Sequence, residues 1–124
     1  MGLINKIFGK TEVQEPQQPS LWKKLTSMDQ IDVIKDLSKD KKVIIFKHST
    51  RCGISGMVWR QFQSKVKEDE EILFFYVDIL ASRDVSDALI HEFQVIHQSP
   101  QVIILKDEKV ISHASHNSIN ALEI

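Results

Sequence analysis

Residues 43–55 read VIIFKHSTRCGIS and contain the only cysteine of the 124-residue chain. The first four residues form a continuous β-branched and aromatic run, which is typical of a strand covered on both faces of its sheet. A helix is predicted after Cys52, because apolar residues recur there every four positions. They are Ile54, Val58, Phe62 and Val66. The cysteine is therefore expected between the end of a buried strand and the first turn of a helix.

The alternation of strand and helix continues along the chain. ILFFYV at 72–77 and VIIL at 102–105 predict two more buried strands. A tight turn at 106–109 leads into a returning strand at 110–113, and the tail from residue 116 is expected to form a short helix. These segments supply most of the predicted sheet.

Two further helices are predicted from apolar residues at helical spacing. These residues are Met28, Ile31, Ile34 and Leu37 in the first helix, and Val85, Leu89 and Phe93 in the second. Ser27 to Gln30 has the form of a capping box, and Ser82 is placed to cap the second helix. A weak edge strand is expected around Trp22 and Leu25.

The resulting order, β-α-β-α-β-α-β-β-α, predicts an α/β fold with a central mixed sheet and helices on both faces. The folded domain is expected to span residues 21–124. Residues 1–20 are interpreted as a flexible tail and linker, since 11–20 contain two prolines and three glutamines. Apolar residues between Leu3 and Phe8 could dock weakly on a membrane or a partner, but a loose terminus is the simpler interpretation.

The composition limits the function classes. The 16 basic and 17 acidic residues nearly balance, so no excess charge indicates a nucleic-acid partner. No apolar stretch is long enough to cross a membrane, and the N-terminus lacks the features of a signal peptide. A single cysteine cannot form an internal disulfide, which favours the reducing cytosol.

Cys52 is interpreted as a reactive thiol. Unpaired N–H groups and the positive end of the dipole at a helix start stabilise a thiolate, and Arg51 adds a positive charge beside it. Gly53 leaves room for a bulky disulfide to approach. Ser55 stands where a dithiol redox protein has its second cysteine, and its hydroxyl can donate a hydrogen bond to the thiolate. An inert apolar thiol is the alternative for a lone cysteine.

Ser99-Pro100 is the second candidate element, between the helix that ends near Phe93 and the VIIL strand. Because proline cannot donate to a sheet, it is expected at the start of that strand. A trans bond is the ordinary state for this pair, whereas a cis bond would be an uncommon feature. A cis bond would leave the backbone of Ser99 free to pair with an incoming peptide.

At these residues the chain resembles the thioredoxin fold, in which the active-site cysteine caps a helix and a cis-proline lies opposite it. FKHSTRCGIS, with SPQVIIL from Ser99 and SHNSI from Ser115, more closely resembles the monothiol bacilliredoxins (YtxJ-like proteins) over residues 21–124. The resemblance implies a thiol–disulfide oxidoreductase that removes bacillithiol from S-bacillithiolated cytosolic proteins under stress.

The resemblance also implies roles for individual residues. Cys52 would be the nucleophile, with Ser55 beside it, and Pro100 would be the cis-proline. The approach to the sulfur would be lined by Thr50, Arg51, Gly53, Ile54 and Ser99. Bacillithiol would act as co-substrate and as the external thiol that resolves the mixed disulfide. No tightly bound cofactor or metal is expected, and the protein is expected to be a cytoplasmic monomer.

Two positions depart from the thioredoxin pattern. Arg51 replaces the aromatic residue that precedes the cysteine, and Phe46 stands where thioredoxins carry a buried acid. The predicted strand therefore supplies no carboxylate that could take a proton during resolution.

Other function classes remain as alternatives. Cys-Gly-Ile-Ser is close to the Cys-Gly-Phe-Ser motif of glutaredoxins that carry iron–sulfur clusters, although their upstream lysine and glycine pair lack clear counterparts. A non-catalytic thioredoxin-like binding module is a further alternative. A phosphatase loop would need arginine where Val58 stands, and a peroxidase would need proline and threonine at Ile45 and Ser49. His113 and His116 lack the partners of a zinc site.

Overall fold

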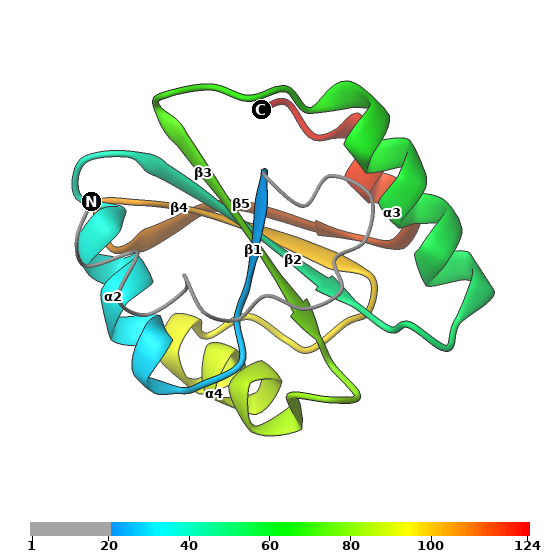
Figure 1. The fold of residues 1–124 in the computed structure, drawn as a ribbon, viewed down its shortest axis with the longest axis horizontal. Coiled ribbons are helices and arrows are strands. Elements are labelled where there is room, and N and C mark those ends of the chain that lie inside the picture. Colours follow the sequence, from blue (N-terminus) through cyan, green and yellow to red (C-terminus); the bar gives the residue numbers. More distant parts are fainter. Residues whose placement is uncertain (1–20) are drawn as a thin grey trace.

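The computed structural model describes residues 21–124, which form one layered α/β unit (Figure 1). The prediction for residues 1–20, including the apolar face near the N-terminus, lies outside the described residues. Along the chain the elements are β1 (Trp22–Lys24), α2 (Asp29–Leu37), β2 (Lys42–His48), α3 (Gly53–Lys65), β3 (Ile72–Asp78), α4 (Arg83–Phe93), β4 (Gln101–Lys106), β5 (Lys109–Ser115) and the 3₁₀ helix η1 (His116–Ala121). This is the predicted order, with the final helix of the 3₁₀ type.

The sheet is mixed and has the strand order β1-β3-β2-β4-β5. The strands β1, β3 and β2 run parallel, and β4 pairs antiparallel with both β2 and β5. The carboxyl ends of β2 and β3 therefore lie at one edge of the sheet, beside the start of β4. This edge carries Cys52, which follows β2 in the chain, and Pro100, which precedes β4.

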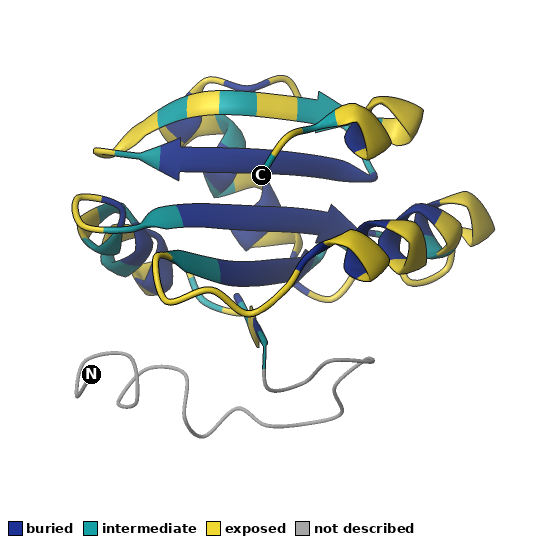
Figure 2. Cartoon of the chain, turned by 90° about the horizontal axis from the view of Figure 1, so that it is seen from above, coloured by how far each residue is buried: buried dark blue, intermediate teal, exposed yellow. Residues whose placement is uncertain are grey.

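The two faces of the sheet bury separate hydrophobic cores, because successive side chains of a strand point to opposite faces. One core lies under α2 and α4 and contains Val43, Ile45, Phe75, Val77, Ile103 and Leu105 from the strands. The other lies under α3 and η1 and contains Ile44, Phe46, Phe74, Tyr76, Val102 and Ile104. Figure 2 shows the central strands buried along most of their length, whereas β5 at the edge alternates between exposed and half-buried residues. The continuous hydrophobic runs in the sequence reflect this coverage on both faces.

An aromatic cluster holds α3 against the sheet. Trp59 on α3 lies 4.8 Å from both Trp22 and Phe46, measured between ring centroids, and 5.3 Å from Tyr76. Trp22 and Trp59 are almost fully buried. Burial of one large apolar side chain contributes about 1.5–3 kcal/mol. The cluster therefore fixes the helix whose first turn carries the cysteine.

For two side chains, the prediction of an apolar packing face from helical spacing was wrong. Met28 is 51% exposed and Ile54 is 58% exposed, although both belong to predicted apolar stripes. Met28 precedes the first turn of α2, and Ile54 lies in the first turn of α3. The later members of each stripe pack on the sheet, whereas these two residues at the helix starts do not. Ile54 is also one of the residues that the resemblance predicts beside the approach to the sulfur.

Local signals account for the ends of several elements. The Gln30 side chain accepts hydrogen bonds from the N–H groups of Thr26 and Ser27, at 2.7 and 2.9 Å, which is the returning half of the predicted capping box. Ser82 precedes α4 as predicted, but its side chain makes no capping hydrogen bond. Asp107 and Glu108 have φ values of 55° and 66°, which gives the tight turn between β4 and β5.

A membrane-spanning helix is absent from residues 21–124, since none of their helices combines the required length and apolar character.

Candidate functional site

Cys52 lies at the N-cap of α3 and is exposed to solvent. Its backbone is extended, with φ −104° and ψ 121°, and its carbonyl oxygen accepts the hydrogen bond of Gly56 N–H at 3.0 Å. The N–H of Cys52 donates to the carbonyl of Ser49 at 3.2 Å, which closes the turn between β2 and α3. The sulfur therefore stands at the positive end of the helix dipole and within reach of a second molecule. An inert thiol buried in the core does not fit this placement.

The predicted approach residues on the α3 side are all exposed. These are Thr50 and Arg51 before the cysteine and Gly53 and Ile54 after it. A Cβ placed on Gly53 would have no neighbouring atom within 4 Å, so this position opens onto solvent. Together these residues form an open surface around the thiol, with one cation and one apolar side chain on it.

The Ser99-Pro100 bond is cis, as the resemblance to thioredoxins implies. Lys47 on β2 pairs in register with Gln101 on β4, so one step further along this register Pro100 lies level with His48. Pro100 is buried, and its carbonyl accepts the N–H of His116 at 3.0 Å. Ser99 is half-buried, and its Oγ has no hydrogen-bond partner among the described residues. The structure thus brings both candidate elements to the same edge of the sheet.

Ser55 is fully buried beneath the first turn of α3. Its Oγ lies 2.7 Å from Nδ1 of His48 and accepts the N–H of Ser49 at 3.0 Å. The His48 ring stacks on Trp59, with centroids 5.6 Å apart and an interplanar angle of 16°. Burial lowers the pKa of His48, opposed by the negative charge of Asp78. These contacts join the end of β2 to the start of α3.

The tautomer of His48 decides where the Ser55 hydroxyl proton points. With the ring proton on Nε2, Nδ1 of His48 accepts the proton of Ser55 Oγ. With the ring proton on Nδ1, His48 donates to Ser55 Oγ, and the serine proton is left for another acceptor. The predicted hydrogen bond from Ser55 to the Cys52 thiolate therefore requires the second tautomer.

Lys47 and His97 form a polar pair on the opposite face of the sheet. Lys47 is 1% exposed, and its Nζ donates to Nδ1 of His97 at 2.9 Å, which places the ring proton of His97 on Nε2. Burial lowers the pKa of Lys47 to about 8, opposed by attraction to Asp87. Burial and the positive charge of Lys47 lower the pKa of His97. The chain from residue 94 that carries His97 also carries Ser99 and Pro100.

Sequence reasoning did not identify Lys47, His48 or His97 as residues of the site. The alternation of side chains along a strand was the available signal. It places Lys47 on the face of Ile45, beneath α4, and His48 on the face of Phe46, beneath α3. The partner of Lys47 could not be found in this way, because His97 is 50 positions away in the chain.

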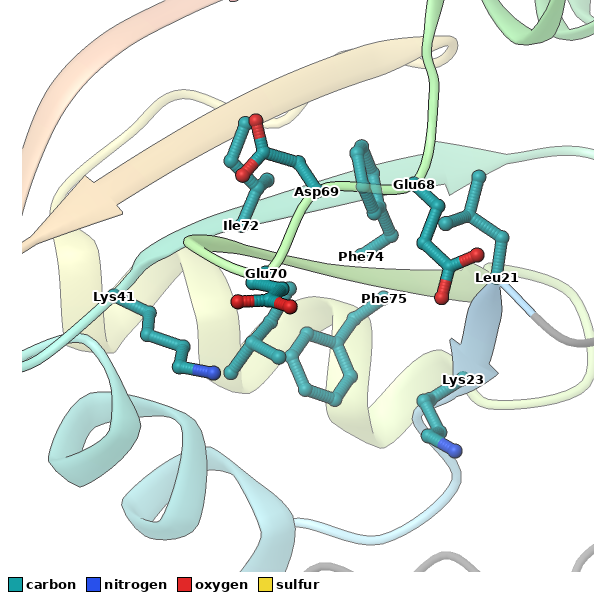
Figure 3. Close-up of a pocket in the computed structure, with 10 residues that line it drawn as sticks. Leu21, Lys23, Lys41, Glu68, Asp69, Glu70, Ile72, Phe74 and Phe75 are labelled. Atoms are coloured by element: carbon teal, nitrogen blue, oxygen red, sulfur yellow. The ribbon is translucent and has the colours of Figure 1, made fainter.

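Cavities lie at both edges of the sheet. One lies at the amino end of β3, where Lys23, Lys41, Glu68 and Glu70 surround apolar side chains (Figure 3). It is at the edge opposite to Cys52. A second cavity of about 290 Å³, called the α4 cavity below, lies at the carboxyl edge. It is lined by Ile79, Leu80, Arg83, Ser86, Asp87 and His97.

A metal centre has no support in the part of the chain that the structure describes. Residues 21–124 contain no group of three His, Cys, Asp or Glu side chains that could hold an ion. His113 is exposed on β5, and His116 begins η1 with a φ of 53°.

Solved structures with the same architecture have thioredoxin folds. A thioredoxin-fold protein assigned as an oxidoreductase matches with 29% identity and a TM-score of 0.71, over 82% of this chain and 88% of its own. Mitochondrial thioredoxin 3 from Saccharomyces cerevisiae matches with 20% identity and a TM-score of 0.60, over 79% and 86%. Spinach chloroplast thioredoxin f matches with 18% identity and a TM-score of 0.60, over 76% and 80%.

The fold and the match to a thioredoxin-fold oxidoreductase define a thioredoxin-like protein, and its exposed cysteine lies at the start of α3. A family model described as monothiol bacilliredoxin BrxC matches residues 23–124. The chain therefore belongs to the monothiol bacilliredoxin family, which confirms the resemblance found in the sequence.

Proposed function

We propose that this protein removes bacillithiol from S-bacillithiolated proteins of the cytoplasm by thiol–disulfide exchange at Cys52. The observation that carries the proposal is the exposed position of Cys52 at the N-terminus of α3, in a chain without a second cysteine. A thiol in such a position can attack a disulfide, but it cannot resolve the product internally.

The reaction has two exchange steps. In the first, the Cys52 thiolate forms a bond to the bacillithiol sulfur, the mixed disulfide of the client protein breaks, and the client cysteine leaves as a thiolate. In the second, the thiolate of free bacillithiol attacks the bacillithiol sulfur held on Cys52. This step releases the Cys52 thiolate and bacillithiol disulfide. The electron pair that reduces the client therefore comes from bacillithiol.

The surroundings of Cys52 support this chemistry. The open surface formed by Thr50, Arg51, Gly53 and Ile54 leaves space for a bulky disulfide. Ser55 occupies the place of a resolving thiol and lies fully buried, held by His48 and Ser49. We assign Ser99 and Pro100 to the opposite side of the approach, where the backbone of Ser99 would pair with the client chain.

Mass spectrometry of Cys52 tests the proposal. A client protein carrying one bacillithiol is mixed with the protein in the absence of free thiol, and both masses are followed. We expect the client to lose one bacillithiol and Cys52 to gain it, and added bacillithiol should then restore free Cys52. The Cys52→Ser variant should leave the client modified, whereas Ser64→Ala, an exposed serine of α3, should act as the wild type.

Two outcomes would contradict the proposal. One is a client that keeps its modification in the presence of the wild-type protein. The other is a Cys52→Ser variant that is as active as the wild type. Anaerobic reconstitution of the same sample with iron and sulfide distinguishes the cluster carrier, which would gain visible absorbance and dimerise.

A further inference from the structure

We propose that the α4 cavity is an anion subsite that binds the malyl carboxylates of bacillithiol, with Arg83 at its wall and Lys47 behind His97. This inference rests on the proposed function, because it assigns a part of the same substrate. Bacillithiol carries its thiol on a cysteinyl group at one side of a glucosamine and two carboxylates on a malyl group at the other. A site that distinguishes bacillithiol from other thiols would contact these carboxylates.

The first observation is the incomplete pairing of Lys47. A buried charge normally has an opposite charge as its partner. None of the ion pairs within residues 21–124 includes Lys47, and its one side-chain hydrogen bond goes to His97. A pKa of about 8 leaves most Lys47 side chains protonated at neutral pH. A positive charge is therefore held inside the protein, and no carboxylate of residues 21–124 is bound to it.

The second observation is the open space beside this charge. His97, which accepts the hydrogen bond of Lys47, lines the α4 cavity together with Arg83 and the hydroxyl-bearing Ser86. Asp87 is the one acidic residue in the lining, so it offsets only one of the two cations, Lys47 and Arg83. Lys47 thus adds a positive charge behind a lining in which Arg83 and Asp87 offset each other. Because an arginine guanidinium can pair with a carboxylate through two parallel hydrogen bonds, Arg83 matches the chemistry of a malyl group.

The third observation is the position of the cavity relative to Cys52. The N–H of Ile79, which lines the cavity, donates to the carbonyl of His48 at 3.0 Å. The next residue after His48 is bonded through its N–H to Ser55 in the first turn of α3. Two consecutive residues thus connect the cavity wall to the helix start that carries the sulfur. The cavity and the sulfur therefore lie at the same edge of the sheet, which is the arrangement that one ligand bound by both requires.

The test compares two substrates that share a disulfide and differ in their carboxylates. One is a peptide in mixed disulfide with bacillithiol, and the other carries the analogue in which a methyl group replaces the malyl group. The single-turnover rate of transfer to Cys52 is measured by mass spectrometry at pH 7 and low salt, and the readout is the ratio of the two rates. A general effect of a variant on folding or on the thiol cancels in this ratio.

We expect the wild type to react about tenfold faster with the malyl substrate, since hydrogen bonds between oppositely charged groups are stronger than those between neutral groups. Lys47→Met and Arg83→Gln should each reduce the ratio several-fold. Arg83 is exposed, so its variant remains informative if Lys47→Met does not fold. Lys23→Gln removes an exposed cation at β1 and should keep the wild-type ratio.

The outcomes separate the two proposals. A wild-type ratio near one, or a ratio that Lys47→Met and Arg83→Gln leave unchanged, would overturn the anion subsite while the transfer itself stands. Absence of transfer from both substrates to the wild-type protein would overturn the proposed function and the subsite with it.

Discussion

Lys47 and His48 are consecutive residues at the end of β2, yet they face opposite sides of the sheet and have different surroundings. His48 lies among Phe46, Trp59 and Tyr76 and bonds to Ser55. Lys47 bonds to His97, next to the α4 cavity. On the α3 side the polar group is enclosed and fixes the helix start, whereas on the α4 side a buried charge lies beside open space.

The difference shows how one strand end can serve two purposes. The enclosed side needs a fixed geometry, because the position of Ser55 and Ser49 sets the turn that presents Cys52. On the open side the protein itself stabilises the Lys47 ammonium only weakly, and a bound anion can stabilise it further. The two sides should therefore respond differently to substitution and to pH.

The largest expected effect is on the Lys47 side. The folded protein holds the Lys47 proton with a pKa of about 8, and the unfolded chain holds it with the ordinary value of 10.5. Between these values the unfolded state binds more protons, so the free energy of unfolding rises with pH. Relative to Lys47→Met, the wild type should gain about 3 kcal/mol between pH 7 and pH 10.5.

Urea unfolding of both proteins across this pH range measures the gain. Because the two proteins share all other titratable groups, the contributions of those groups cancel in the difference between the wild type and Lys47→Met. A difference between the two proteins that stays constant with pH would show that Lys47 titrates normally in the folded state.

The next largest effect is on the His48 side. Ser55→Ala leaves Nδ1 of His48 and the N–H of Ser49 without their partner, so the free energy of unfolding should fall by about 2 kcal/mol. In a His48→Phe background the same substitution should have a smaller effect, because the His48 partner is already absent. Urea unfolding of the four proteins gives the coupling, and Ser64→Ala on the same helix is the exposed control.

A coupling near zero would mean that His48 and Ser55 contribute independently, and the enclosed side would then not act as a unit.

Much of this fold follows from local sequence signals. VIIF, ILFFYV and VIIL predicted the three central strands, because a strand covered on both faces must be hydrophobic at every position. The junction of the first run with a helix also predicted the place of Cys52. The cis state of Ser99-Pro100 came from the resemblance, since trans is the ordinary state of such a bond.

The contacts around the site could not be predicted in the same way. Lys47 and His97 meet only because β4 pairs with β2, which brings distant segments together. His48 and Ser55 meet across the turn between β2 and α3, and neither a helical nor a strand repeat predicts a contact between a strand residue and a helix residue. The exposure of Ile54 depends on its place in the first turn of α3, which the apolar spacing does not report.

The smallest expected effect concerns the hydrogen bond between Lys47 and His97. In His97→Leu the side chain still covers Lys47 but cannot accept a hydrogen bond from it. The ammonium then lacks its partner, so the pKa of Lys47 should fall further. The free energy of unfolding of the variant should therefore start to rise at a lower pH than that of the wild type, and its total rise should be larger by about 1 kcal/mol. His97→Asn keeps an acceptor near the position of Nδ1 and should restore the wild-type profile in urea unfolding. Identical profiles for His97→Leu and the wild type would show that burial alone sets the pKa of Lys47.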